Sequence, residues 1–127
     1  MKIDRLNYVD MAEQVIQDLK NRDRNGRLML TTSKIRNLLS ITAELYTDAQ
    51  QQRGEILSEE LQGRVQYLRM RMAYEAGRDP AVKGFVAAAK LLDQLSAIHS
   101  ERKNLLLFCR YMEALVAYHR YYGGRDK

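Results

Sequence analysis

Hydrophobic residues recur at the three- and four-residue spacing of an α-helix along five long stretches of the chain. With their capping residues, these stretches cover residues 7–20, 31–51, 58–77, 80–99 and 100–122, and none alternates like a β-strand. Most connections between them are short, and short connections join antiparallel neighbours. The pattern therefore predicts an all-α fold, a compact bundle of about five helices without a sheet.

The chain of 127 residues is long enough for one hydrophobic core, so we expect a single helical domain over residues 1–127. The one long connection is a basic loop at residues 21–31, in which Asn25-Gly26 marks a turn. The helix at 80–99 is apolar nearly all round, which is typical of a helix that is central in a bundle or covered by another subunit.

The helix at residues 58–77 carries two stripes of side chains. The first is apolar and consists of Leu61, Val65, Leu68, Met72 and Ala76. The second lies ~120° around the helix and alternates guanidinium groups with phenols, namely Arg64, Tyr67, Arg71, Tyr74 and Arg78. Such a surface suits an anionic polymer, and RNA is the first candidate.

The same stripe also has a structural interpretation. Residues 58–80 are neutral overall, and Glu75 stands at the helical spacing at which it can pair with both Arg71 and Arg78. The tyrosines would then pack at the boundary of the core. Arg69 lies two residues before Arg71 and would widen the basic surface.

Positive charge is concentrated in two parts of a chain whose net charge is +5. Residues 21–36 hold five cations against one acid, and residues 102–127 hold six against two. This distribution is typical of a nucleic-acid binder, although a merely solubilising surface explains it equally well. Arginine outnumbers lysine by 14 to 7, and because arginine binds phosphate in a bidentate manner, the ratio favours RNA.

Histidine and cysteine, which often form metal and nucleophile sites, are few in this chain. The only histidines are His99 and His119, on different predicted helices, and Cys109 is the only cysteine. We expect a core cysteine, a boundary histidine at 119, and no catalytic, metal or cofactor site. A single cysteine, no apolar run of ~20 residues and no apolar signal region after Met1 predict a cytoplasmic protein without a membrane span.

Lys34 and Arg36 stand in the first turn of the helix at 31–51, directly after the capping candidates Thr31, Thr32 and Ser33. Free backbone N–H groups, hydroxyls and two cations would converge on one anion there. Simple capping with solvent-facing cations is an equally good interpretation.

Three segments together resemble the small subunit of the type III-A CRISPR effector, the Csm complex. They are residues 30–39 (LTTSKIRNLL), 65–78 (VQYLRMRMAYEAGR) and 107–119 (LFCRYMEALVAYH). The resemblance implies an all-helical subunit without catalytic activity, several copies of which stack as a short filament beside the backbone and large subunits. It also implies contacts to the backbone of the crRNA and its target RNA, made without reading their sequence.

The residues expected to contact RNA combine the charge pattern and the resemblance. They are Lys34, Arg36, Arg64, Arg69, Arg71, Arg78 and Arg110. In this hypothesis the arginines contact a paired RNA backbone, and the tyrosines between them mostly pack. The alternative is a helical protein–protein adaptor whose basic faces meet acidic partners.

Overall fold

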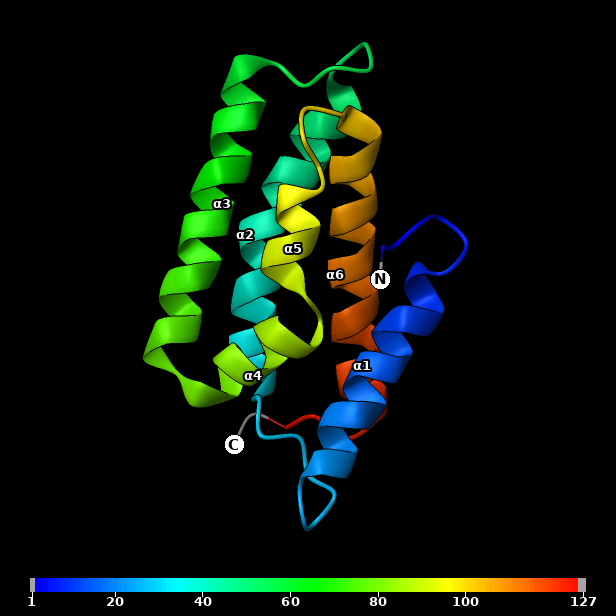
Figure 1. Ribbon diagram of the computed structural model, residues 1–127, viewed down its shortest axis with the longest axis vertical. Helices are drawn as coiled ribbons and strands as arrows, with labels where there is room; N and C mark the ends of the chain where they lie inside the picture. The colour runs from blue at the N-terminus through cyan, green and yellow to red at the C-terminus, as the bar shows by residue number, and fades with distance from the viewer. Residues whose placement is uncertain (1, 126–127) are drawn as a thin grey trace.

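A computed structural model describes residues 2–125 of the chain, and it is all-α, as predicted (Figure 1). Its helices are α1 (Tyr8–Arg22), α2 (Thr32–Gln51), α3 (Glu59–Arg78), α4 (Pro80–Ala88), α5 (Leu91–Ser96) and α6 (Arg102–Tyr121). Within this range no sheet forms, and the only β-type pairing is an isolated antiparallel bridge between Ile56 and Glu101.

The three longest helices, α2, α3 and α6, run along the long axis of the molecule (Figure 1). α6 packs mainly against α1 and α2, whereas α3 packs mainly against α4 and also contacts α2 and α5. The short helices α4 and α5 cover the face that Figure 1 turns to the viewer, so α2 is left to form much of the opposite face. None of the helices described is both long and apolar enough to cross a membrane.

The helix ends follow local capping chemistry. The Thr31 and Ser58 hydroxyls accept backbone N–H groups in the first turns of α2 and α3, at 3.3 and 3.2 Å, because these N–H groups have no partner inside the helix. Asp79 caps α4 directly before Pro80. Ser100 begins the predicted stretch 100–122, and its residue type predicts an N-cap there, but this prediction is wrong, since Glu101 is the N-cap of α6 and makes no side-chain capping bond.

Every helix contributes buried side chains to one hydrophobic core. The apolar stripe predicted for α3 is confirmed in full, since its five members are the buried residues of that helix. The largest fully buried side chains are Tyr111, Phe85 and Phe108. Val9 follows the apolar spacing of its helix, which predicts a buried side chain, but it is 39% exposed because α1 is an outer helix packed mainly against α6.

The single helix expected over residues 80–99 is instead two short helices. The break falls at Ala89 and Lys90, and Lys90 adopts a left-handed conformation with φ 55°. The buried Tyr111 hydroxyl of α6 donates a 3.0 Å hydrogen bond to the Ala89 carbonyl at the break. Because α4 contacts α1 and α3 while α5 contacts α3 and α6, the break turns one apolar segment toward different neighbours.

Candidate nucleic-acid interface

Four of the seven predicted RNA contacts gather where α2 and α3 lie side by side. We call this surface the α2–α3 seam, and it consists of Lys34, Asp48, Arg64, Arg71, Glu75, Arg78 and Asp79. Two ion pairs cross between elements: Lys34 on α2 pairs with Asp79, and Arg64 on α3 pairs with Asp48 on α2 at 2.6 Å. The seam therefore sets three carboxylates against four cations, and each of its cations has a carboxylate partner.

Glu75 lies at the centre of the seam and holds two guanidinium groups. One carboxylate oxygen contacts Arg71 at 3.1 Å, and the other contacts Arg78 at 3.5 Å. The i+4 and i+3 pairs expected from the helical spacing are thereby confirmed. The nearby Tyr67 hydroxyl and Glu75 carboxylate raise the pKa of the Arg71 guanidinium, which stays fully charged.

Tyr67 and Tyr74 do not pack into the core. They are 54% and 58% exposed, so the expectation that these tyrosines mostly pack is wrong for the chain by itself. Both tyrosines lie on a different side of α3 from the apolar stripe. The guanidinium group of Arg78 lies over the Tyr74 ring, 5.5 Å from its centroid. The phenols thus belong to the outer surface beside the seam.

The remaining predicted contacts lie outside the seam and are exposed: Arg36 on α2, Arg69 on α3 and Arg110 on α6. No carboxylate pairs with any of them among the described residues. Arg110 sits over the ring of Tyr46 at 5.4 Å, and Arg69 hydrogen-bonds Gln66 at 3.5 Å. At ~100° per residue, Arg69 lies ~160° around α3 from Arg71, so the two arginines face different sides of the helix.

The N-terminus of α2 is capped rather than open. The Thr31 hydroxyl accepts the backbone N–H of Lys34, and the Lys34 ammonium group contacts the Asp79 carboxylate. That ion pair, with the backbone N–H of Ala81, lowers the pKa of Asp79. A cavity of about 160 Å³ between α2, α3 and α4 is lined by this pair and by Glu75 and Arg78.

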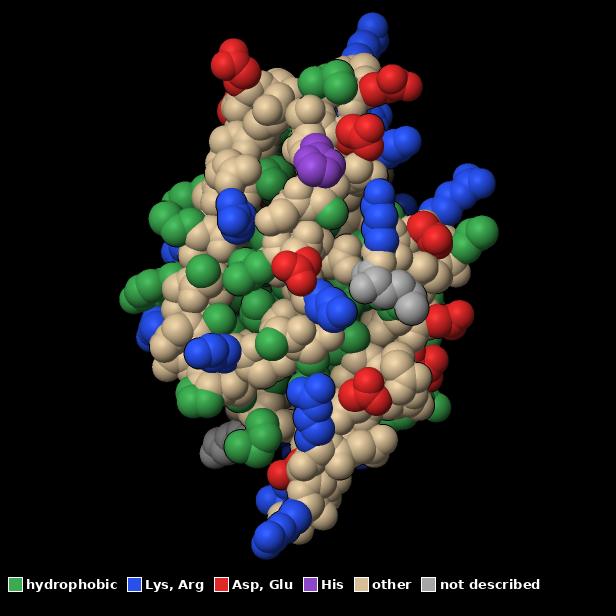
Figure 2. All heavy atoms as spheres, viewed as in Figure 1, with side chains coloured by type: hydrophobic (Ala, Val, Ile, Leu, Met, Phe, Trp, Pro, Cys, Tyr) green, Lys and Arg blue, Asp and Glu red, His purple; other side chains and the backbone are tan. Residues whose placement is uncertain are grey.

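Charged side chains of both signs are interspersed on the face that carries α4 and α5 (Figure 2). The basic loop predicted after α1 is short, since α1 continues to Arg22. The Asp23 carboxylate orders this loop by accepting the backbone N–H groups of Asn25 and Arg27, each at 3.0 Å. Its arginines are exposed, and among residues 2–125 none of them forms an ion pair with a residue of the seam.

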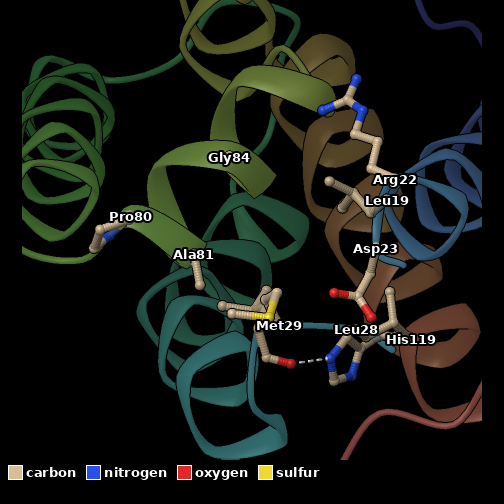
Figure 3. Close-up of a pocket in the computed structure, with 10 residues that line it drawn as sticks. Leu19, Arg22, Asp23, Leu28, Met29, Pro80, Ala81, Gly84 and His119 are labelled. Carbon is tan, nitrogen blue, oxygen red and sulfur yellow. Dashed lines mark hydrogen bonds between the residues drawn. The ribbon is translucent and has the colours of Figure 1, made fainter. Parts of the chain in front are cut away.

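A second cavity, of about 360 Å³, lies between α1, the segment before α2 and the start of α4 (Figure 3). His119 borders it, only 1% exposed, with Nε2 2.7 Å from the Leu30 carbonyl oxygen. Burial lowers the pKa of His119, so the ring is neutral and Nε2–H donates to Leu30. The Arg22 guanidinium points away from His119 (Figure 3). The bond from His119 to Leu30 therefore has a structural role, because it joins α6 to the segment before α2.

The other chemically reactive side chains are also structural or isolated. Cys109 is buried, and burial raises the pKa of its thiol to about 12. His99 is exposed at a left-handed turn with φ 55°. Among residues 2–125, His, Cys, Asp and Glu side chains form no group of three or more that is arranged to hold a metal ion.

Known proteins with similar sequences cover nearly the whole chain. The family model described as Csm2 Type III-A matches residues 5–125. The "CRISPR system Cms protein Csm2" of Mycobacterium tuberculosis (strain CDC 1551 / Oshkosh) is 50% identical over 120 residues, which cover 94% of each chain. The proteins of the same name from Streptococcus thermophilus and Enterococcus italicus are 46% and 36% identical, over 94% and 93% of this chain. The matched regions cover 94% of the Streptococcus thermophilus protein and 91% of the Enterococcus italicus protein.

The resemblance found in the three sequence segments is confirmed by these matches, which extend into the N-terminal helix that no motif covers. A family match over residues 5–125 and identities of 36% to 50% over more than nine-tenths of the chain leave one conclusion. The chain belongs to the Csm2 family, the small subunit of type III-A CRISPR systems.

Proposed function

We propose that this chain is a non-catalytic subunit that binds the backbone of crRNA and target RNA in a type III-A interference complex in the cytoplasm. It acts through phosphate contacts from arginine and lysine. Because the guide sequence varies, the contacts carry no sequence preference. Copies of the chain associate with one another and with the other Csm subunits, which together complete the channel that holds the RNA.

One observation carries the proposal: Arg36, Arg69 and Arg110 are exposed on three rigid helices without a carboxylate partner in the part of the chain described. A guanidinium group offers several N–H donors in a planar fork that matches a phosphate group. Family membership supplies the class of system, and these three arginines supply groups that an RNA backbone satisfies.

Self-association is supported by apolar surface that the chain leaves open. A groove of about 560 Å³ between α3 and the α4–α5 segment is lined largely by small apolar residues, among them Ala73, Gly77 and Ala87. It is formed partly by the segment whose all-round apolar character predicted cover from another subunit. We assign the groove to contacts between subunits rather than to RNA.

The test is RNA binding measured by fluorescence anisotropy over a series of salt concentrations, with unrelated single-stranded RNAs. We expect similar affinities for all sequences and a steep loss of affinity with salt. In the triple variant Arg36→Ala, Arg69→Ala, Arg110→Ala, the slope of log affinity against log salt falls in magnitude by ~2, from ~0.7 for each lost contact.

A matched control removes three exposed cations elsewhere: Arg5→Ala, Lys83→Ala, Lys103→Ala. This control has the same net charge as the first variant, so equal losses in both variants would show a diffuse charge effect and contradict the assigned contacts. If the unaltered chain binds no RNA, the protein–protein adaptor is the better function. The seam is the specific observation in favour of the adaptor, since four predicted cations already have carboxylate partners.

A further inference from the structure

We propose that Glu75 and Asp48 limit the affinity of this chain for RNA, because they occupy the seam arginines with carboxylate groups that compete with phosphate. The inference rests on the proposed function and adds to it two acidic residues that set binding strength. It assigns them a negative effect: removing either carboxylate makes RNA binding tighter.

Glu75 is placed to compete effectively. Its side chain is only 14% exposed and lies between Arg71 and Arg78 on the same helix, with one oxygen on each guanidinium. Because all three residues share one rigid helix, the carboxylate is always within reach of both arginines. One acidic side chain therefore contacts two of the predicted RNA-binding arginines.

Arg71 still has an unused donor in this arrangement. Its Nε–H is buried and has no hydrogen-bond partner among the described residues, whereas a terminal nitrogen is held by Glu75. A guanidinium binds an oxyanion best with two parallel N–H groups, and the single contact from Glu75 does not provide this. A phosphate that replaced Glu75 could satisfy the fork more fully.

Asp48 occupies Arg64 in a different way. An oxygen of the Asp48 carboxylate on α2 lies 2.6 Å from a guanidinium nitrogen of Arg64 on α3. The Asp48 side chain is 48% exposed and the Arg64 side chain is 33% exposed. An ion pair as exposed as this one is weak in water, because both groups are solvated and screened by salt. The polyanionic backbone of RNA can therefore exchange with Asp48, but has to displace it first.

The remaining ion pair of the seam, between Lys34 and Asp79, is unsuitable for a test. Asp79 holds Lys34, but the same side chain accepts the backbone N–H of Ala81 as the N-cap of α4. A substitution there would disturb the helix as well as the charge. Glu75 and Asp48 make no capping bond, so their amide variants change the charge and little else.

The experiment compares Glu75→Gln, Asp48→Asn and the control Glu44→Gln in the RNA-binding assay. Glu44 is exposed on α2 and has no ion pair among the described residues, so its variant makes the same change in net charge without releasing an arginine. We expect Glu75→Gln to bind single-stranded RNA ~3- to 10-fold more tightly, since Arg71 and Arg78 both lose the carboxylate that they share. Its salt slope should be steeper by ~1.4, from two contacts of ~0.7 each.

Asp48→Asn releases one arginine, so about half that change in slope is expected, and Glu44→Gln should change affinity less than twofold. If the unaltered chain binds RNA but both test variants behave like Glu44→Gln, the inference is overturned and the proposed function stands. If the unaltered chain fails to bind RNA at all, the proposed function is wrong. A thermal melt by circular dichroism of each variant establishes that affinities are compared between folded proteins.

Discussion

The C-terminal end of α6 provides a sharp stability prediction, because a single methyl group at Gly124 has no room. α6 ends in a Schellman motif, in which the N–H groups of Gly123 and Gly124 bond the carbonyls of Arg120 and His119 at 3.2 and 2.8 Å. A Cβ atom on Gly124 would lie 2.1 Å from Cε1 and 2.2 Å from Nδ1 of His119. The His119 ring or the chain end has to move.

Either movement costs a buried hydrogen bond. If the ring moves, the Leu30 carbonyl loses the Nε2–H of His119, and Leu30 is only 4% exposed. If the chain end moves, the Gly124 bond to His119 and the bond from the Thr32 N–H to the Arg125 carbonyl are both at risk. Leaving one buried polar group unpaired costs ~1–3 kcal/mol, so Gly124→Ala should lower the free energy of unfolding by ~2 kcal/mol. For a chain of this size, that corresponds to ~8 °C in Tm.

The assay is urea and thermal unfolding followed by far-UV circular dichroism. The control is Gly63→Ala, because an added Cβ at Gly63 meets no atom within 4 Å on the exposed face of α3. A glycine in a helix interior is unfavourable, so this control should gain ~0.5–1 kcal/mol. Equal shifts in the two variants would refute the reasoning, since the contact with His119 would then have no energetic effect.

Two further predictions concern buried titratable groups. Burial lowers the pKa of His119; the charge of Arg120 adds to this effect, and the bond to Leu30 opposes it. As the pH falls, His119 therefore binds a proton in the unfolded chain before it does so in the folded chain. Stability should therefore be full above pH ~6.5 and fall as the pH drops below it, by up to ~1.4 kcal/mol per unit, whereas His119→Gln should lose this part of the pH dependence. A pH profile unchanged by His119→Gln would contradict the burial argument. For Cys109, a pKa of about 12 and 4% exposure predict no reaction with a thiol reagent at mildly alkaline pH until urea unfolds the chain. Modification of the folded protein at the rate of a free thiol would show that this part of the core opens.

Much of the fold followed from residues whose effects are local. The stripe from Leu61 to Ala76 identified the buried face of α3, and Asp79-Pro80 located the start of α4, because apolar periodicity and capping act within a few residues. The break at Lys90 was missed for the opposite reason. No glycine or proline stands at the break, and the contacts there, such as the bond from Tyr111, come from a helix some twenty residues further along the chain.

The candidate interface shows the same division. The sequence gives the Glu75 pairs with Arg71 and Arg78, since helical spacing alone brings these side chains together. It gives no sign of the pairs from Lys34 to Asp79 and from Arg64 to Asp48, which depend on how α2 lies against α3 and α4. Only the packed helices show which predicted cations are neutralised.

By itself, the sequence determined the helical class, the buried face of α3, the charge of the surface and the family, because each depends on residue type and short-range spacing. Tertiary structure decided the division of the 80–99 segment, the exposure of Tyr67 and Tyr74, and the separation of paired arginines from unpaired ones. These features depend on which helix covers which surface, and contacts between residues distant in the chain leave no periodic signal in the sequence.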